Sequence, residues 1–380
     1  MWILQGEASS GSQREREEDK RERLIMRVAV DAMGAEKGLD IVIEGAIKAK
    51  KVNPEIEVVL VGDKEKIEDE IIKSSFKEAS FSIVHAPEMV KVTDSATVSA
   101  KKKKNSSITL ALDLLKEGKV EALVSAGNTG AVMTASLFKL GKLEGVKRPC
   151  LAVVLPTLSG GEAVLLDVGA NVNCRAHHLF QFAIMGSIYA YKVLRKRAPR
   201  VGLLNIGEEE NKGNTLALQT FQLLKKSSLN FVGNVEGRDI TSGNVEVVVC
   251  DGFTGNVILK FAEGFAETAL EIMNEEIKKS LPFLGGLLSK KWLGQAKRDL
   301  DYSEYGGAPL LGVNGVCIVA HGASSSKAIK NAILASFEFA KGQINEHIKR
   351  ALARNKEVRD ENEEKQYSGD RVLYSQKSLD

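Results

Sequence analysis

Short apolar segments rich in β-branched residues recur along the chain, separated by longer segments in which apolar residues repeat at helical spacing. The short segments are apolar at consecutive positions, as expected for strands that helices cover on both faces of a sheet. They are Val28–Val30, Val58–Val61, Ala122–Val124, Leu151–Leu155, Val164–Val168, Val201–Ile206, Val245–Val249 and Val316–Ala320. The helical segments are Gly38–Lys51, Ile108–Lys116, His177–Leu194, Asn214–Lys226 and Ser324–Lys349. This alternation predicts a three-layer α/β/α fold with a large, mostly parallel sheet.

One pair of neighbouring strands departs from the alternation, because no helical segment separates 151–155 from 162–168. The residues between them, Thr157–Gly161, include a serine and two glycines, a composition typical of a tight turn. We therefore expect these two strands to form an antiparallel hairpin, which makes the sheet mixed.

Charge patterning divides the chain into a folded part and two extensions. Residues 1–25 contain five basic and six acidic side chains, and residues 354–380 contain six basic and seven acidic ones, with little apolar periodicity. Segments of this kind have little to bury and are expected to be solvated. The folded domain is accordingly expected to span residues 26–353.

Composition and charge argue against several classes of protein. Apolar residues make up 43% of the chain and charged residues 27%, as in globular enzymes, and the net charge of +3 is too small to indicate nucleic-acid binding. The cysteines, Cys150, Cys174, Cys250 and Cys317, are widely separated, which argues against a disulfide framework or a zinc ribbon. No apolar run is long enough to span a membrane, and the charged first residues differ from a secretory signal, so a cytoplasmic location is expected.

Six predicted strands are followed by loops of small and hydrogen-bonding residues. These loops are Asp31–Gly34, Ser125–Gly130, Asp167–Asn171, Asn205–Glu209, Asp251–Asn256 and His321–Ser324. Any one of them could be an ordinary turn. Because the carboxyl ends of parallel strands share one edge of a sheet, where ligands bind, we expect the six loops to converge on a single cleft.

The loop Gly127–Gly130 favours an anion, and phosphate above all. Its glycines let backbone N–H groups approach a ligand, and the helix that follows adds the positive end of its dipole. The chain has neither the P-loop motif GxxxxGK[ST] nor the dinucleotide motif GxGxxG, and it lacks the serine-hydrolase and zinc-protease motifs GxSxG and HExxH.

Charged and nucleophilic residues near these loops have competing interpretations. Lys212 and Lys260 follow two of the loops closely enough to offset an anion, although lysines inside a helix commonly face solvent. His321 ends a buried strand and is either a core residue or a member of the site, which its place at the sheet edge favours. Cys174 lies near a helix start that would stabilise a thiolate, but no paired base accompanies it, which favours inert packing.

The order of the motifs VAVDAMG, SAGNTGA, LLDVGANVNC, VGLLNIGEEENKGN, VVVCDGFTGNVILKFAEG and LLGVNGVCIVAHGASS resembles the bacterial phosphate acyltransferase family of phospholipid synthesis, the PlsX family. The resemblance covers about residues 26–345, nearly the whole folded part. The sequence departs from the family at two places. The usual DAMGGD with a following proline is replaced by DAMGAEK, and around Met89–Ser107 an acidic, proline-containing stretch with arginine is replaced by Val90–Thr93 and the four lysines Lys101–Lys104.

This resemblance implies transfer of a long acyl chain from acyl carrier protein to inorganic phosphate, giving acyl phosphate. It further implies a fold like those of isopropylmalate dehydrogenase and phosphotransacetylase, a homodimer, no metal or organic cofactor, and contact with the next acyltransferase of the pathway. Two rival functions stay open: a phosphotransacetylase-like enzyme that uses coenzyme A, and a non-enzymatic protein that binds acyl groups or anions at a membrane surface.

The candidate residues suit that chemistry, because a thioester is already activated and phosphate is already a nucleophile. Such an enzyme mainly holds the reactants together and stabilises an oxyanion with fixed donors. The candidate catalytic residues are Asn205, Lys212, Lys260 and His321. The candidate phosphate- or substrate-binding residues are Asp31, Ser125, Gly127, Asn128, Thr129, Gly130, Asp167, Asn171, Glu208, Asp251, Gly252, Thr254, Gly255 and Asn256.

Two surface features are expected to contact partners. The basic segments Lys101–Lys104 and Arg195–Arg197 offer docking sites for the acidic carrier protein, or are simply solvated. A helix hairpin is expected to project around 257–300, because Pro282 and two glycines interrupt a helical stretch. Its apolar tip suits a membrane headgroup boundary, through Phe283, Leu284, Leu287, Leu288 and Trp292, with packing in a dimer as the alternative. The protein is therefore expected to associate peripherally with the membrane.

Overall fold

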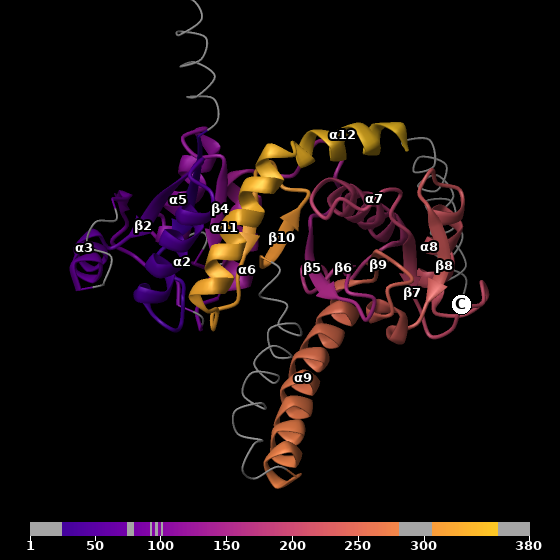
Figure 1. Cartoon of the computed structure of the whole chain (residues 1–380). Coiled ribbons are helices and arrows are strands. Elements are labelled where there is room, and N and C mark those ends of the chain that lie inside the picture. The colour runs from indigo at the N-terminus through magenta and orange to yellow at the C-terminus, as the bar shows by residue number, and fades with distance from the viewer. Residues whose placement is uncertain are drawn as a thin grey trace, which may run out of the picture.

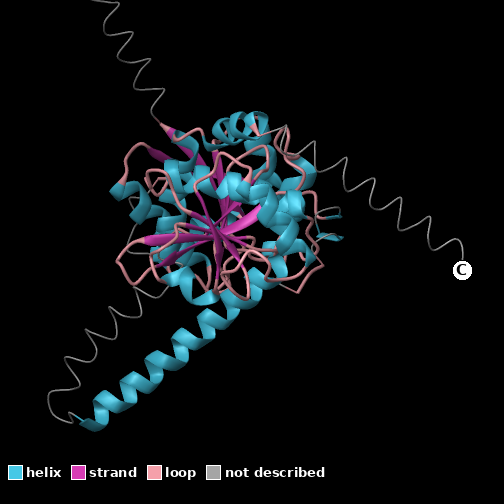
Figure 2. Ribbon diagram, turned by 90° about the vertical axis from the view of Figure 1, so that its right-hand side faces the viewer, coloured by secondary structure: helices cyan, strands magenta, loops and turns pink. Residues whose placement is uncertain are grey.

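The computed structural model describes residues 25–73, 80–91, 93–95, 98–99, 102–280 and 306–355. In these residues one large sheet runs through the molecule in the order β3-β2-β1-β4-β11-β10-β5-β6-β9-β7-β8 (Figure 1). The strands are β1 (Met26–Asp31), β2 (Ile56–Gly62), β3 (Ser82–His85), β4 (Ala122–Ser125), β5 (Cys150–Pro156), β6 (Glu162–Leu166), β7 (Val201–Leu204), β8 (Phe231–Val235), β9 (Val247–Val249), β10 (Ala308–Leu311) and β11 (Cys317–Val319). The sheet is strongly twisted, so its strands fan out inside a shell of helices (Figure 2).

Helices cover both faces of this sheet. They are α2 (Leu39–Val52), α3 (Lys64–Lys73), α5 (Ser107–Lys116), α6 (Thr129–Lys139), α7 (Ala176–Lys192), α8 (Thr215–Lys225), the 3₁₀ helix η1 (Gly237–Thr241), α9 (Gly252–Ser280), α11 (Ser326–Lys341) and α12 (Ile344–Arg354). In β1, Val28 and Val30 join the core beneath α2, α7 and α11, whereas Ala29 joins the core beneath α5 and α6. Successive residues of the strand thus bury opposite faces, which confirms the predicted three-layer fold.

The sheet is mixed, and its two halves run in opposite directions. Strands β3, β2, β1, β4 and β11 are parallel to one another, as are β6, β9, β7 and β8. Between these halves, β10 and β5 form antiparallel pairs, and the predicted β5–β6 hairpin is confirmed. The expectation that all strand ends share one edge is therefore wrong: the carboxyl ends of the two halves approach the central strands from opposite directions.

Three short strands and one helix boundary differ from the sequence prediction. The missed strands are β3, which is only partly buried, β8, which contains Gly233 and Asn234, and β10, which contains Pro309. The first two lack the continuous apolar pattern of a buried strand, and the proline of β10 argues against a strand in the sequence although its residues are buried. The helix expected over Ser324–Lys349 is two helices, α11 and α12, because Gln343 takes a left-handed conformation with φ 48° between them.

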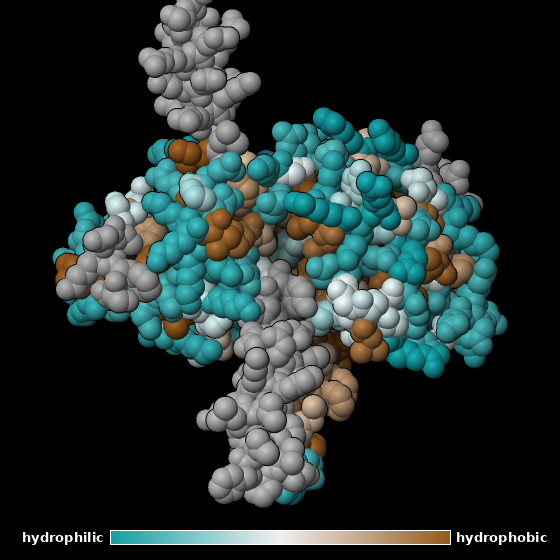
Figure 3. All heavy atoms as spheres, in the orientation of Figure 1, coloured by the Kyte–Doolittle hydropathy of each residue, from teal (hydrophilic) through white to brown (hydrophobic). Residues whose placement is uncertain are grey.

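Helix α9 projects from the body of the molecule (Figures 1 and 2). Phe253, Val257, Phe261 and Phe265 follow each other at intervals of four residues and are all exposed, which gives this helix an apolar stripe. Tan and brown side chains on its visible part contrast with the mostly teal body (Figure 3). The tip expected at Phe283–Trp292 lies outside the described residues. Within the described part of the chain, no helix is both long enough and apolar enough to cross a lipid bilayer.

Candidate active site

A pocket of about 300 Å³, the central pocket, lies over the middle strands of the sheet. The loops after β4, β6, β9 and β11 meet there, together with the first turns of α6 and α9. Its lining residues are Thr129, Gly130, Met133, Leu151, Val153, Val168, Gly169, Asn256, Leu259, Lys260, Glu263, Ala308, Val319, Ala320 and His321. Four of the six predicted loops are thus brought together, over an apolar floor from β5, β10 and β11.

The loop after β1 packs against the Ser125–Gly130 loop, on the side away from the central pocket. The Ser125 hydroxyl donates to Asp31 Oδ2 at 2.7 Å and accepts from the Gly127 N–H at 3.1 Å. A Cβ on Gly34 would come within 2.6 Å of the Gly127 nitrogen, so only glycine allows this close approach. Burial raises the pKa of Asp31 despite these hydrogen bonds. The buried side chains of Asp31 and Ser125 therefore shape the Gly127 loop from inside the protein.

Asn128 caps helix α6. Its Oδ1 accepts from the Ala131 N–H at 2.9 Å, and its Nδ2 donates to the carbonyl of Asp94 at 3.4 Å. This cap fixes the first turn of α6, whose Thr129 and Gly130 line the pocket. The N–H groups of a first helical turn have no partner within the helix, so they are available to an anion.

The loop after β6 is organised by the buried carboxylate of Asp167. Its Oδ1 accepts from the N–H groups of Leu151 (2.9 Å) and Ala170 (3.1 Å). Its Oδ2 accepts from the N–H and the Nδ2 of Asn171, at 2.7 and 2.9 Å. Burial is the largest influence on the pKa of Asp167 and raises it. The side chains of Asp167 and Asn171 thus hold the loop in shape and do not line the central pocket.

Helix α9 begins against this loop. A Cβ on Gly252 would approach the backbone of Asn171 to 2.8 Å, and one on Gly255 would overlap the carbonyl oxygen of Asp167. These two glycines let the helix start close to the sheet. As a result, Asn256 on the next turn faces the central pocket opposite Gly169.

A cation and a hydrogen-bond donor face the polar side of the central pocket. Lys260 Nζ donates to Glu263 Oε2 at 2.8 Å, while Glu263 Oε1 is buried without a hydrogen-bond partner among the described residues. His321 Nδ1 accepts from the Ala323 N–H at 3.1 Å. In the neutral ring this bond assigns the hydrogen to Nε2, so His321 can donate from that atom.

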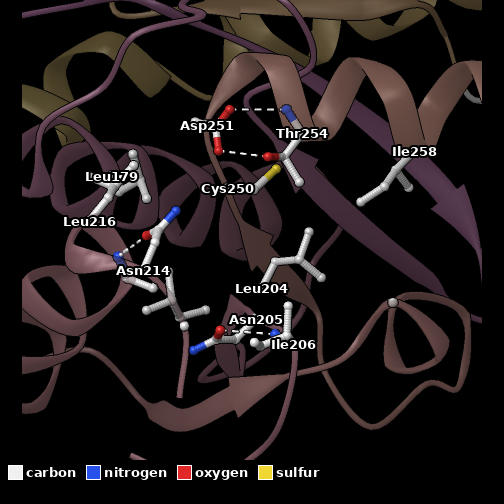
Figure 4. Close-up of a pocket in the computed structure, with 14 residues that line it drawn as sticks. Leu179, Leu204, Asn205, Ile206, Asn214, Leu216, Cys250, Asp251, Thr254 and Ile258 are labelled. Carbon is white, nitrogen blue, oxygen red and sulfur yellow. Dashed lines mark hydrogen bonds between the residues drawn. The ribbon is translucent and has the colours of Figure 1, made fainter. Parts of the chain in front are cut away.

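The loop after β7 lies elsewhere, so the expectation of a single cleft is wrong. Asn205 lines a second pocket, on the other side of α9, together with Asp251 and Thr254 (Figure 4). Lys212 is exposed and lines neither pocket; its carbonyl accepts from Asn205 Nδ2 at 3.0 Å. Glu208 is also exposed and lies 3.7 Å from Arg238. The physical reason is strand order, because β9 separates β7 from the central strands.

The cysteines offer no thiolate at neutral pH. Cys174 donates to the Asn171 carbonyl at 3.4 Å, and burial foremost, with Asp167 next, raises its pKa to about 12. Cys150, Cys250 and Cys317 are buried, and burial raises the pKa of each. In the described ranges, no three His, Cys, Asp or Glu side chains come together in a way that could hold a metal ion.

Comparison with known proteins assigns the family. The sequence model of the family described as "Fatty acid synthesis protein" matches residues 26–347. Phosphate acyltransferase of Geotalea daltonii is 47% identical over 331 residues, which cover 87% of this chain and 95% of that protein. Phosphate acyltransferase of Desulforamulus reducens is 48% identical over 334 residues, covering 88% and 99%. The chain belongs to the phosphate acyltransferase family. It is an acyltransferase, and the resemblance seen in its motifs is confirmed.

Solved structures agree with the fold of this phosphate acyltransferase family member. A phosphotransacetylase from Streptococcus pyogenes superposes with a TM-score of 0.56 at 16% identity, covering 87% of this chain and 98% of that one. A branched-chain phosphotransacylase from Enterococcus faecalis gives a TM-score of 0.51 at 14% identity, covering 84% and 99%. At such low identity these likenesses establish the shared α/β architecture alone, and the phosphotransacetylase-like fold predicted from the sequence is confirmed.

Sequence reasoning missed part of the pocket of this acyltransferase. Glu263 stands three residues after Lys260, one helical turn away, and that spacing could have identified it as the lysine's partner. The apolar floor, which includes Val153 and Ala308, carried no signal, because its residues look like ordinary core positions.

Replacing Asn128 by alanine is expected to raise the KM for phosphate about fivefold, because losing an N-cap costs about 1 kcal/mol and loosens the first turn of α6. Asn128→Ser restores a capping oxygen and should recover most of the affinity. Steady-state kinetics with varied phosphate would measure both variants. Equal impairment of the serine and alanine variants would contradict the capping role and assign the carboxamide itself to the substrate.

Proposed function

We propose that this protein transfers a long-chain acyl group from the thioester of acyl carrier protein to inorganic phosphate, giving acyl phosphate. The observation that carries this proposal is the composition of the central pocket. The first turn of α6, Lys260 and His321 line it together with apolar residues of β5, β10 and β11. A doubly charged nucleophile and a hydrocarbon-bearing carbonyl need these two environments side by side.

The residues take distinct roles in this proposal. Phosphate binds at the N–H groups of Thr129 and Gly130, where the helix dipole and Lys260 offset its charge. The Nε2–H of His321 donates to the carbonyl oxygen of the thioester, which gains negative charge as a phosphate oxygen forms the new C–O bond. The C–S bond then breaks, and the thiolate leaves and takes a proton from water. None of these steps requires a cofactor.

Purified protein incubated with hexadecanoyl acyl carrier protein tests the proposal. Free carrier protein and acyl phosphate should appear in equal amounts, and only when phosphate is present. Faster reaction with hexadecanoyl-coenzyme A would instead support the phosphotransacetylase-like alternative. Binding of phosphate without any turnover would support the non-enzymatic alternative.

Docking of the acidic carrier protein is proposed at the lysine segment Lys102–Lys104. Lys103 donates to Asp94 Oδ2 at 2.7 Å, and the Asp94 carbonyl accepts from Asn128, so this segment adjoins the pocket edge. Lys102 and Lys104 are exposed, whereas Lys101 lies outside the described residues. The exposed lysines are therefore free to meet a partner while Lys103 holds the loop.

Changing Lys102 and Lys104 together to Glu is expected to raise the KM for the carrier protein about tenfold at low salt, with little change in kcat, because steered association weakens when charge is reversed. The difference from the unmodified protein should shrink as salt screens it. Arg195→Glu with Arg197→Glu is the matched control, since Arg195 pairs with Glu338 of α11 on the other face of the sheet. If the arginine pair raised the KM for the carrier protein more than the lysine pair, the docking site would instead be Arg195–Arg197.

The apolar stripe of α9 supports two further proposals about assembly. Phe261 and Phe265 stack with ring centroids 5.8 Å apart and are nonetheless exposed, so this face is available to a further apolar surface. We propose that a second copy of the chain and a membrane surface, met through Phe283–Trp292, together cover the outer part of the projection from Phe261 onward, and that Phe253 and Val257 next to the body stay uncovered. Peripheral attachment would place the enzyme where its product is used by the next acyltransferase.

A further inference from the structure

The second pocket is not used by the reaction as derived above. It has a volume of about 410 Å³, within the range of about 300–1,000 Å³ typical of small-molecule sites. Its apolar lining includes Leu179, Leu204, Ile206, Leu216, Ala217 and Ile258. The side chains of Leu179, Leu204 and Ile258 surround the same space (Figure 4).

Most of the polar groups in this pocket already hydrogen-bond to the protein. Both carboxylate oxygens of Asp251 accept from Thr254, from its N–H at 3.0 Å and its hydroxyl at 2.7 Å. Asn205 uses its Nδ2 on the Lys212 carbonyl and its Oδ1 on a neighbouring N–H. Asn214 Oδ1 caps α8 through the Ala217 N–H at 2.9 Å. The surface left for a ligand is mainly apolar, and such a cavity favours hydrocarbon over water, which needs several polar partners.

The two pockets flank the same two turns of α9. Asn256 and Lys260 face the central pocket, whereas Thr254 and Ile258 face the second one. At 100° per residue, Phe253 and Val257 lie between these sides on the outer surface of the helix. They are 62% and 52% exposed. An apolar path therefore runs over the helix from one pocket toward the other.

We propose that the second pocket receives the hydrocarbon chain of the acyl donor. The thioester lies in the central pocket, the chain crosses Phe253 and Val257, and its end is buried among Leu204, Leu216 and Ile258. Ile206, which is 81% exposed on the pocket lining, then packs against the chain. This inference rests on the proposed function and adds to it a physical basis for preferring long acyl chains.

The proposal is tested by filling the pocket and measuring how kcat/KM depends on the length of the acyl chain of the donor. In the unmodified protein, kcat/KM should rise about fourfold for each methylene that enters the pocket, which corresponds to about 0.8 kcal/mol. Ala217→Trp should abolish this rise, so that a hexadecanoyl donor loses at least about tenfold while a butanoyl donor changes less than about twofold. Leu218→Trp, on the exposed neighbouring residue of α8, is the matched control and should keep the original profile.

A second variant and a binding measurement distinguish a role of the pocket in chain binding from a general loss of activity. Leu216→Ala enlarges the pocket and should shift the preferred donor to a longer chain. Independently of turnover, a fluorescent hexadecanoate probe should bind the unmodified protein and bind Ala217→Trp at least about tenfold more weakly, without loss in Leu218→Trp. If Ala217→Trp lowers all donors equally, or if the profiles of both pocket variants match the unmodified protein, the inference is wrong. Absence of acyl phosphate with every donor would overturn the proposed function, whereas absence of probe binding would overturn the pocket assignment.

Discussion

Replacing His321 with alanine is expected to lower kcat/KM for acyl phosphate formation by about 10²- to 10³-fold, the usual effect of removing one preorganised oxyanion donor. The donor is preorganised because the Ala323 N–H occupies Nδ1 and leaves the hydrogen on Nε2. Initial rates with saturating phosphate would measure the effect, and it should fall mainly on kcat, since the charge on the carbonyl oxygen develops during reaction.

Two variants separate this role from a structural one. His321→Gln keeps a donating side chain and should retain more activity than the alanine variant, with an unchanged unfolding midpoint in urea. Ala323→Pro removes the N–H that holds Nδ1 and should also lower kcat, although less. If His321→Ala were to change only the KM for phosphate, the histidine would belong to phosphate binding and not to the carbonyl.

Replacing Asp167 with alanine is expected to destabilise the fold by more than about 3 kcal/mol, because each buried donor left without an acceptor costs about 1–3 kcal/mol. Four such donors converge on this carboxylate, from Leu151, Ala170 and Asn171. The start of α9 rests on the same loop, so activity should fall with stability. Urea unfolding followed by circular dichroism would measure the loss.

Asp251→Ala is the matched control for Asp167. Asp251 also accepts two hydrogen bonds, but it is half-buried and serves only Thr254, so its loss should cost about 1 kcal/mol, as for other helix caps. Asp167→Asn keeps one acceptor oxygen and should fall between the two alanine variants. A destabilisation by Asp167→Ala no larger than that by Asp251→Ala would contradict the organising role of the buried carboxylate.

The sequence predicted the layered fold well because a strand buried on both faces is apolar at consecutive positions. Strands such as β5 and β6 are apolar at nearly every position, and the loops that follow β4, β6, β9 and β11 carry the small residues that a pocket needs. Strands β8 and β10 were not predicted, because Gly233 and Pro309 are typical of turns. Their existence depends on pairing with neighbours, which local pattern does not encode.

The candidate site was predicted less completely, for two physical reasons. Residue type does not reveal which way a side chain turns. Asp167 occurs in the expected loop but accepts from the loop's N–H groups, and Asn171 donates to the Pro149 carbonyl and to Asp167, so neither side chain lines the central pocket. Strand order is also absent from the local pattern, so nothing in the sequence separated the Asn205 loop from the loops around Lys260 and His321. Both pieces of information arise only when distant segments pair.

The place of β10 and β11 in the sheet has a consequence for how the protein is made. These strands come from residues 308–319, yet they sit between β4 and β5, which are made from residues 122–156. While the ribosome is still making the middle of the chain, both of those earlier strands have an unpaired edge, and open edges invite wrong partners. Insertion of the late strands closes both edges at once and delivers His321 to the pocket. Catalytic competence and protection from aggregation are thus expected to appear in the same late step of folding.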